Sequence, residues 1–196
     1  MSNDSSKPNT DPKQHIIMVL ARAKQSTYLL KTLLLSTSLT DPLIFHLWDI
    51  QYRMLYVDLY ILFDKQKNHL NIRKVLETSK SKLKNSEYEA LAANFQTIEK
   101  KYSQVIKTTV RIGNSIIRHL DPIAIPFIYG DDYFNKDNSF ELTEVKSMLD
   151  EVIELLKDST IFAEKFFQHF DVIVEYAQIM RQLNLEIDNN RQAFFD

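Results

Sequence analysis

Apolar side chains recur at alternating steps of three and four residues through most of this chain, which is the spacing of one face of an α-helix. The longest such stripe lies within residues 86–121, and it predicts one unbroken helix roughly 50 Å long. Ser86 and Glu89 are placed to form a capping box at its start, and Pro122 follows its end. The stripe consists of Tyr88, Leu91, Phe95, Ile98, Tyr102, Val105, Thr109, Ile112, Ile116 and His119.

Two more helices are expected before the long one, over residues 13–35 and 42–64. The second of them begins where Thr40 and Asp41 precede Pro42, because a capping side chain followed by proline is typical of a helix start. This helix is apolar on nearly every side. We therefore expect it to be the buried helix of the fold.

A short basic helix is expected over residues 71–83, with its apolar side chains facing inward. After the long helix, the prolines and the glycine of residues 121–139 indicate an irregular loop. Beyond it, residues 158–160 either cap a fresh helix or lie inside one long bent helix. The first apolar seam there is Leu142, Val145, Leu149, Val152 and Leu156, and the second is Phe162, Phe166, Phe170, Ile173, Ala177 and Met180.

The sequence shows no strand-like alternation, no internal repeat and no sign of a second domain. Residues 1–12 are polar and have little to bury, so we expect a disordered tail. Residues 13–196 are expected to form one domain. The predicted fold class is all-α, an antiparallel helical bundle of about five to six helices.

Composition excludes several kinds of chemistry. The chain has 196 residues, 44% of them apolar, and no cysteine, so neither disulfides nor thiolate metal sites are possible. Its only two glycines, Gly113 and Gly130, cannot make a glycine-rich phosphate loop, and no Glu-x-x-His metal signature is present. We expect no cofactor and no metal. Without a signal peptide or a long apolar segment, the expected location is cytoplasmic, away from the membrane.

Charge is distributed unevenly although the net charge is only −2. Residues 64–120 hold twelve Lys and Arg against five Asp and Glu, whereas residues 121–196 hold six against sixteen. Two interpretations fit this pattern. Either each helix has an ordinary solvated face, or the basic middle is a surface for a phosphate backbone, with an acidic partner surface in the same molecule or a neighbouring one.

The end of the long stripe carries the main candidate for chemistry. Arg111 and Arg118 lie about 20° apart around a helix axis, with Ser115 between them and His119 at the edge of the apolar seam. Two arginines and a histidine are able to hold a phosphate and move a proton near neutral pH. The alternative is that the arginines complement the helix dipole and the histidine is half-buried in the bundle.

Two stretches of the chain are similar to a known family. Residues 114–121, NSIIRHLD, resemble the helix end of the HEPN superfamily, in particular the AbiU abortive-infection branch, where an Arg-Asn pair leads to a His and then an Asp. Residues 56–77 resemble the leucine-rich helix of that branch, which ends in Leu-Phe-Asp. The resemblance spans residues 45–156. It implies an all-α bundle that often dimerises and, in active members, a metal-independent endoribonuclease of abortive-infection, phage-defence or toxin-antitoxin systems.

The resemblance assigns roles to individual positions. It implies that His119 is the catalytic histidine, that Asn114 is the polar residue after the arginine and that Asp121 is the aspartate after the histidine. The family places four to six residues between its Arg and His, and Gly113 stands where the arginine is expected. We expect Arg118 to be the better substitute, since Arg111 points about 200° away from residue 113.

Further residues are expected to support this site. Lys100, Lys101, Lys107 and Ser115 are predicted to contact RNA. Asp64 follows the end of a helix, where the dipole disfavours a carboxylate, so a cationic partner is expected. It either orients His119 or pairs with Arg111, or it is a surface residue near a lysine.

The predicted function is therefore an HEPN-like protein associated with RNA, with metal-independent cleavage as its expected chemistry and a homodimer as its expected state. The alternative is a non-catalytic helical module that binds a protein partner or dimerises. Phe166, Phe167 and Phe170 are candidates for a dimer face. Salt separates the two functions, because RNA binding weakens steeply with added salt and an apolar interface does not.

Overall fold

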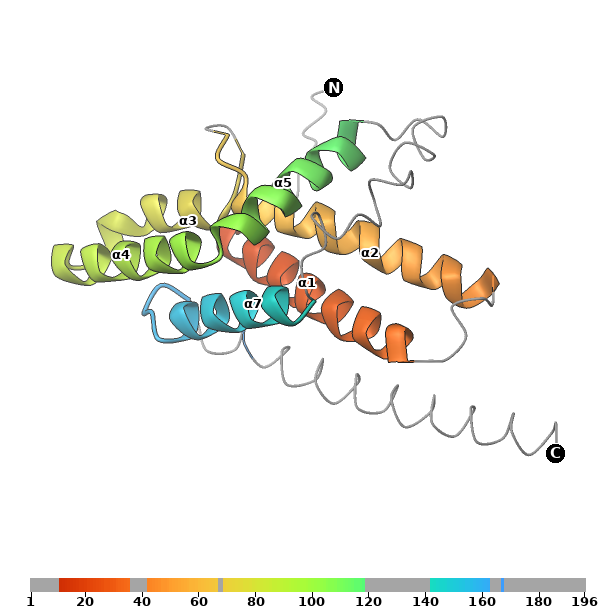
Figure 1. The fold of residues 1–196 in the computed structure, drawn as a ribbon. Coiled ribbons are helices and arrows are strands. Elements are labelled where there is room, and N and C mark those ends of the chain that lie inside the picture. The colour runs from red at the N-terminus through yellow and green to blue at the C-terminus, as the bar shows by residue number, and fades with distance from the viewer. Residues whose placement is uncertain (1–10, 36–41, 67–68, 119–141, 163–166, 168–196) are drawn as a thin grey trace, which may run out of the picture.

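The computed structural model describes residues 11–35, 42–66, 69–118, 142–162 and 167, and every regular element within them is helical (Figure 1). The all-α prediction is confirmed for this part of the chain. An antiparallel arrangement of the whole bundle stays a prediction. The described elements are α1 (Pro12–Leu35), α2 (Pro42–Phe63), α3 (Ile72–Ser79), the 3₁₀ turn η1 (Lys80–Lys82), α4 (Asn85–Lys101), α5 (Ser103–Arg118) and α7 (Leu142–Lys157).

The start of α1 lies slightly before the predicted position. A carboxylate oxygen of Asp11 accepts the backbone N–H of Lys13 at 3.0 Å, and the Asp11 carbonyl accepts that of His15. Pro12 occupies the first turn, so an Asp-Pro pair begins this helix as one was predicted to begin α2. The predicted tail therefore extends too far by two residues, and its residues 1–10 lie outside the described part.

An ion pair between the exposed Arg22 and the buried Asp58 joins α1 to α2. Arg22 Nε donates to both carboxylate oxygens of Asp58, at 2.8 and 3.0 Å, and Asp58 is only 1% exposed. Burial raises the pKa of Asp58, while the guanidinium of Arg22 acts in the opposite direction. Ser26 Oγ donates to Gln51 one turn further along α1. Since the higher residue number in α1 meets the lower one in α2, the two helices run in opposite directions.

Burial along α2 differs between its two halves. Leu55, Leu59 and Leu62 are buried in the core, as the apolar sequence predicted. The expectation that the whole helix is buried is wrong for its earlier turns, because Leu47 is 43% exposed and Ile50 is 38% exposed. An apolar residue at a helix surface is common in itself, so hydrophobicity alone does not show which turns are covered.

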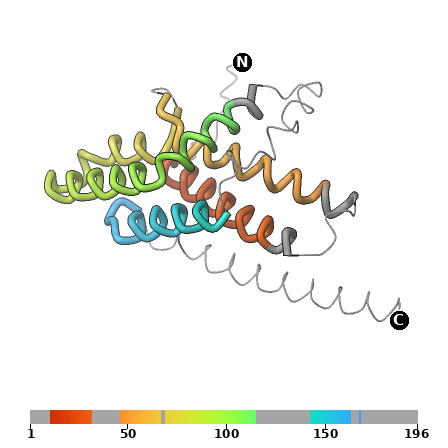
Figure 2. Tube along the Cα trace, viewed as in Figure 1, coloured from red at the N-terminus to blue at the C-terminus, as the bar shows by residue number. Residues whose placement is uncertain are grey.

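α7 closes the core against α1 and α4 (Figure 2). Its predicted seam is confirmed, since Val145, Leu149, Val152 and Leu156 are fully buried. Lys24 of α1 forms an ion pair with Asp150 of α7 at 3.1 Å. The predicted inward face of the short basic helix is confirmed as well: Ile72, Val75 and Leu76 of α3 are buried.

The prediction of one unbroken helix over residues 86–121 is wrong. The backbone leaves helical geometry at Tyr102, with φ −102° and ψ 25°, and this residue separates α4 from α5. The two helices pack on different partners, because α4 lies against α7 whereas α5 lies along α2 (Figure 1). The apolar stripe continues through Tyr102, so its period did not reveal the break.

The start of α4 also differs from the prediction. The helix begins at Asn85, and its capping carboxylate belongs to Glu87, which accepts the backbone N–H of Lys84 at 3.2 Å. The predicted pair of Ser86 and Glu89 therefore lies too far into the helix. Glu87 takes this role because it is the third residue after Lys84, the position from which a side chain reaches back to the first free donor.

The end of α7 settles one open alternative. The helix stops at Lys157, and Ser159 Oγ donates to the Leu156 carbonyl at 2.7 Å. A long bent helix through residues 158–160 is therefore excluded. Phe167 is buried against Phe162, so it does not belong to an exposed dimer face. Phe166 and Phe170, the rest of the second seam beyond Phe162 and the loop of residues 121–139 lie outside the described part.

Among the helices that the structure describes, none combines the length and the apolar character that crossing a membrane requires.

Candidate functional site

The predicted catalytic cluster lies at the C-terminal end of α5, and the structure describes part of it. Arg111 is exposed on this helix, and Asn114 is half-buried one turn later. Arg118 is the last residue of α5. The side chains that lie outside the described part are those of Ser115, Arg118, His119 and Asp121. The convergence of Arg111 with His119 therefore stays a prediction.

At Gly113, α5 lies in close contact with α2. A Cβ atom at this position would lie 2.5 Å from the carbonyl oxygen of Tyr56 and 2.6 Å from Cβ of Tyr60. Real Cβ atoms essentially never approach that closely, so any side chain here requires α5 to move away from α2. The arginine that the family resemblance calls for cannot occupy position 113 in this packing.

Small side chains along one face of α5 allow this close approach to α2. Val105, Thr109 and Gly113 follow one another at steps of four residues, and all three are buried. The Thr109 hydroxyl is satisfied within its own helix, since it donates to the Val105 carbonyl at 2.9 Å. The predicted seam passed through Ile112, which is only half-buried. The true seam keeps the four-residue step because α5 crosses one neighbour, α2.

An aromatic column on α2 faces this region. Trp48, Tyr52, Tyr56 and Tyr60 are spaced at four residues, so they lie along one side of the helix. Trp48 stacks on Tyr52 with 4.8 Å between ring centroids, and the hydroxyls of Tyr52 and Tyr56 are 2.7 Å apart. Tyr60 meets the ring of His69 edge to face. The column therefore leads to the connection between α2 and α3.

That connection is braced by buried hydrogen bonds. Asp64 is 7% exposed, and its carboxylate accepts a hydrogen bond from Nδ1 of His69 at 2.6 Å. Asn71 caps α3 through Oδ1, which accepts the Lys74 N–H, and its Nδ2 donates to the Asp64 carbonyl. The partner of the Asp64 carboxylate is thus His69 and not Arg111, and the interpretation of Asp64 as a surface residue is wrong. Any link to His119 lies outside the described part.

A pocket of about 240 Å³ opens between this connection and the beginning of α5. Small-molecule sites commonly enclose roughly 300 to 1,000 Å³, so this pocket suits one group of a larger ligand. Its wall combines charged side chains with a buried apolar part formed by Phe63 and Ile106. The lining residues are Phe63, Asp64, Lys65, Glu99, Ser103, Ile106, Lys107 and Val110.

Both carboxylates at the pocket have a bonding partner, whereas its two lysines have no acidic partner among the described residues. Glu99 forms an ion pair with Arg73, and Asp64 is hydrogen-bonded by His69. Among the described residues, neither Lys65 nor Lys107 has an acidic partner. Within the same part of the chain, no three His, Cys, Asp or Glu side chains converge as metal ligands. The free charge at the pocket is positive, which suits an anion.

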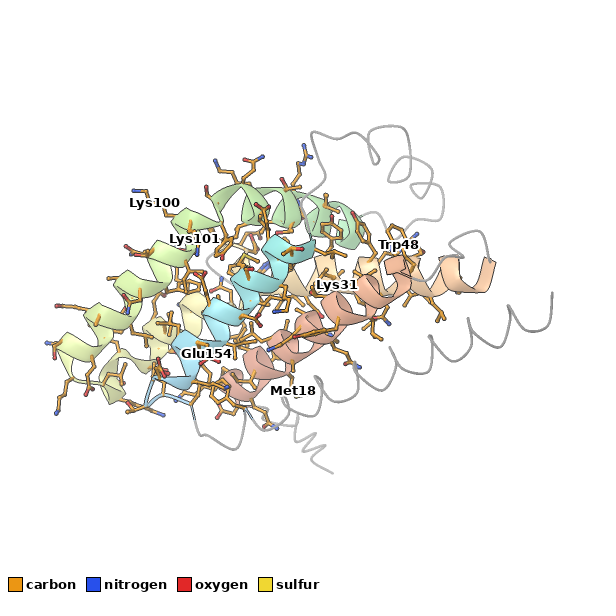
Figure 3. The ribbon with its side chains drawn as sticks, turned by 60° about the horizontal axis from the view of Figure 1, so that its bottom comes forward. Met18, Lys31, Trp48, Lys100, Lys101 and Glu154 are labelled. Carbon is orange, nitrogen blue, oxygen red and sulfur yellow. The ribbon has the colours of Figure 1, made fainter. Side chains whose placement is uncertain are left out.

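Cations continue from the pocket along the outer side of α4 and α5. Lys107 and Arg111 are exposed one turn apart on α5, and Lys100 is exposed just before the break. Figure 3 shows Lys100 extending outward from the end of α4. We call Lys100, Lys107 and Arg111 the basic row. The predicted RNA-contacting lysines at positions 100 and 107 are thus both exposed, as is Arg111.

Lys101 has a different environment from the basic row. Its ammonium pairs with Glu151 of α7, and the hydroxyl of Tyr102 donates to the same carboxylate at 2.7 Å. The hydrogen bond with Glu151 raises the pKa of Lys101, while Lys101 lowers the pKa of Glu151. Partial burial raises the pKa of Tyr102. Here the basic middle of the chain meets its acidic end inside one molecule.

Sequence reasoning did not single out Lys65, which lines the pocket, or His69, which is the hydrogen-bond partner of Asp64. Lys65 and His69 belong to a segment, KQKNHLN, that we interpreted as a polar loop. Their signal is the Asp64 carboxylate five residues before a histidine, directly after an apolar helix. Such a spacing across a loop brings the two side chains together only in particular loop conformations, so the sequence did not show the contact.

Comparisons of this chain with protein-family models, with curated proteins and with solved structures give no match. The resemblance to the HEPN superfamily therefore depends on the residues of the chain itself.

Proposed function

We propose that this chain is an HEPN-like helical protein that binds single-stranded RNA along the basic row of α4 and α5. The observation that carries the proposal is that exposed cations of this row continue into a pocket whose lysines have no acidic partner among the described residues. Phosphates of nucleic acids are bound mainly by such lysines and arginines, which release condensed counterions when they bind.

Two acidic residues of α7 pair with cations outside the basic row. Asp150 of α7 is paired with Lys24 and Lys146, and Glu151 is paired with Lys101. Among the described residues, neither Lys100 nor Lys107 has an acidic partner. This supports the interpretation of the basic middle as a phosphate-binding surface.

Binding is tested by measuring RNA affinity at several salt concentrations. We expect log K to fall with log salt for a short single-stranded RNA followed by fluorescence anisotropy between about 50 and about 200 mM salt. Replacing Lys100, Lys107 and Arg111 by glutamine together should reduce the slope by about 0.7 for each phosphate that the variant no longer neutralises. The matched control replaces three exposed lysines at the other end of α4: Lys80, Lys82 and Lys84.

The two triple variants have the same net charge. The comparison therefore distinguishes RNA binding at the basic row from a general electrostatic attraction to a positively charged protein. An equal loss of affinity in both variants would contradict the proposal. An affinity that does not depend on salt would contradict it as well.

Cleavage is the second part of the proposal, and it centres on His119. Because Gly113 faces α2, an arginine for this chemistry has to come from Arg118 or Arg111 instead. The purified protein should therefore cleave a mixed RNA pool in EDTA, and His119→Ala should abolish the cleavage, with the Arg118→Ala and Arg111→Ala variants assayed beside it. If all four proteins leave the RNA intact, the chain binds RNA without cutting it.

One observation favours a second candidate function, the binding of a protein partner. Leu47 and Ile50 are both exposed and lie about one turn apart on α2. Apolar side chains that gather on a surface are typical of protein interfaces. Sedimentation velocity at high salt tests this candidate, because an apolar interface persists there. A self-association or a partner complex that Leu47→Ser and Ile50→Ser leave unchanged would exclude these residues from the interface.

A further inference from the structure

We infer that the pocket between the end of α2 and the beginning of α5 binds a phosphomonoester, the phosphorylated end of an RNA strand. This inference rests on the proposed RNA binding and adds a specificity to it. The basic row contacts phosphates along the strand, while the pocket takes the group at which the strand ends.

The charge of the pocket favours an anion. Lys65 and Lys107 line it, and Arg73 approaches it through its ion pair with Glu99. These three cations face two carboxylates, those of Asp64 and Glu99, and both carboxylates already have a partner. A ligand that brings negative charge therefore completes the pairing of the two lysines, whereas a cationic ligand finds no free carboxylate.

The size of the pocket and its apolar wall favour a phosphate at the end of an RNA strand over a phosphate within the strand. Its volume of about 240 Å³ is bounded on one side by the buried side chains of Phe63 and Ile106. Such a wall offers no contact to a charged strand that continues in both directions. A phosphomonoester carries a charge of about −1.5 to −2 near pH 7 and three acceptor oxygens, whereas a chain phosphate carries a single charge. Two lysines and the hydroxyl of Ser103 match the monoester better.

The backbone that carries the two lysines of the pocket is anchored at both positions. Lys65 follows Asp64 directly, and Asp64 is hydrogen-bonded to His69 through its carboxylate and to Asn71 through its carbonyl. Lys107 lies on the second turn of α5, and α5 packs closely on α2 at Gly113. The two lysines therefore reach the pocket from two separate segments of the chain.

The test compares RNAs that differ only at their ends. One short single-stranded sequence is prepared with a 5′-phosphate, with a 3′-phosphate and with hydroxyls at both ends, and each is bound to the full chain. We expect one phosphorylated form to bind about tenfold more tightly than the hydroxyl form, as an added charge-assisted contact does. The preferred form identifies which end of the strand enters the pocket.

Two single variants separate the pocket from the basic row. Lys65→Gln, at an exposed position, should abolish the preference, so that the phosphorylated and hydroxyl forms bind with equal affinity. Lys100→Gln should weaken all three RNAs alike and preserve the preference. Equal binding of the three forms would overturn the inference, and so would a preference that survives Lys65→Gln. In both cases RNA binding itself stands.

Failure of the proposed function gives a different result, in which none of the three RNAs binds. The pocket is then tested alone with uridine 5′-monophosphate and uridine 3′-monophosphate, followed by NMR shifts of backbone amides. Shifts at Lys65 and Ser103 that disappear in Lys65→Gln support a phosphomonoester site. The absence of shifts at these residues overturns it.

Discussion

α4 and α5 are joined through a single residue, yet they pack by opposite means. α4 buries the large side chains of Leu91, Phe95 and Ile98, and the ring of Phe95 stacks on Phe63. α5 turns small residues toward α2 and lies in close contact with it at Gly113. An amphipathic stripe therefore shows that a helix is buried on one face, and the sizes of its side chains show how closely the partner approaches.

The difference between the two helices predicts opposite responses to a change of volume. α4 should be damaged by the removal of atoms, and α5 by their addition. The largest effect is expected on α4. Phe95→Ala should lower the free energy of unfolding by about 3–5 kcal/mol, because it removes a buried ring that no neighbour replaces. Urea denaturation followed by circular dichroism measures the loss.

The control for Phe95→Ala is Gln96→Ala, at the exposed neighbouring position of the same helix. It should change the free energy of unfolding by no more than about 0.5 kcal/mol. A loss of similar size in both variants would mean that α4 as a whole is fragile and that its buried face is not the cause.

The second-largest change in stability is expected for Gly113→Ala on α5. Helix propensity alone would predict the opposite sign for this change. Gly113→Ala gains about 1 kcal/mol in helix propensity, but its Cβ meets the carbonyl oxygen of Tyr56 at 2.5 Å. Since overpacking typically costs about 1–3 kcal/mol, we expect a net loss of stability. Gln104→Ala, exposed on the same helix, serves as the control. A rise in the midpoint of Gly113→Ala would show that α5 does not approach α2 this closely.

The smallest effect concerns the junction between the two helices. Lys101 lowers the pKa of Glu151 below its ordinary value of 4.5, so the ionised carboxylate favours the folded state above that pH, and its contribution is lost as the pH falls through the lowered pKa. Glu151→Gln should therefore melt slightly below the native protein at pH 7. The two melting temperatures should converge as the pH falls below the lowered pKa of Glu151. A gap that widens on acidification would contradict this sign.

The features of the fold that could be predicted from the sequence are those determined by neighbouring residues. The start of α2 at Pro42, the inward face of α3 and the buried seam of α7 depend on neighbours within one or two turns, which sequence patterns describe well. Sequence did not predict the break at Tyr102, because the apolar stripe runs through it and only the separate partners of α4 and α5 cause it.

The candidate site was less accessible to sequence reasoning. Lys100 and Lys107 were predicted to contact RNA because they belong to the basic middle of the chain, whereas Arg111 was predicted to belong to the catalytic cluster. The contact of His69 with Asp64 depends on a loop conformation, and the pocket depends on how α2 meets α5. The role of Gly113 was missed for the same reason. A glycine within a helix marks a weak position in the sequence, and only the neighbouring backbone shows that it is required.

Gly113 also has a consequence for evolution. A protein that diverged from a common ancestor and carries a larger residue at this position must hold α5 farther from α2. Ile106 and Val110, which line the pocket, would move with the helix. A larger residue at position 113 would therefore change the shape of the pocket as well as the packing of α5.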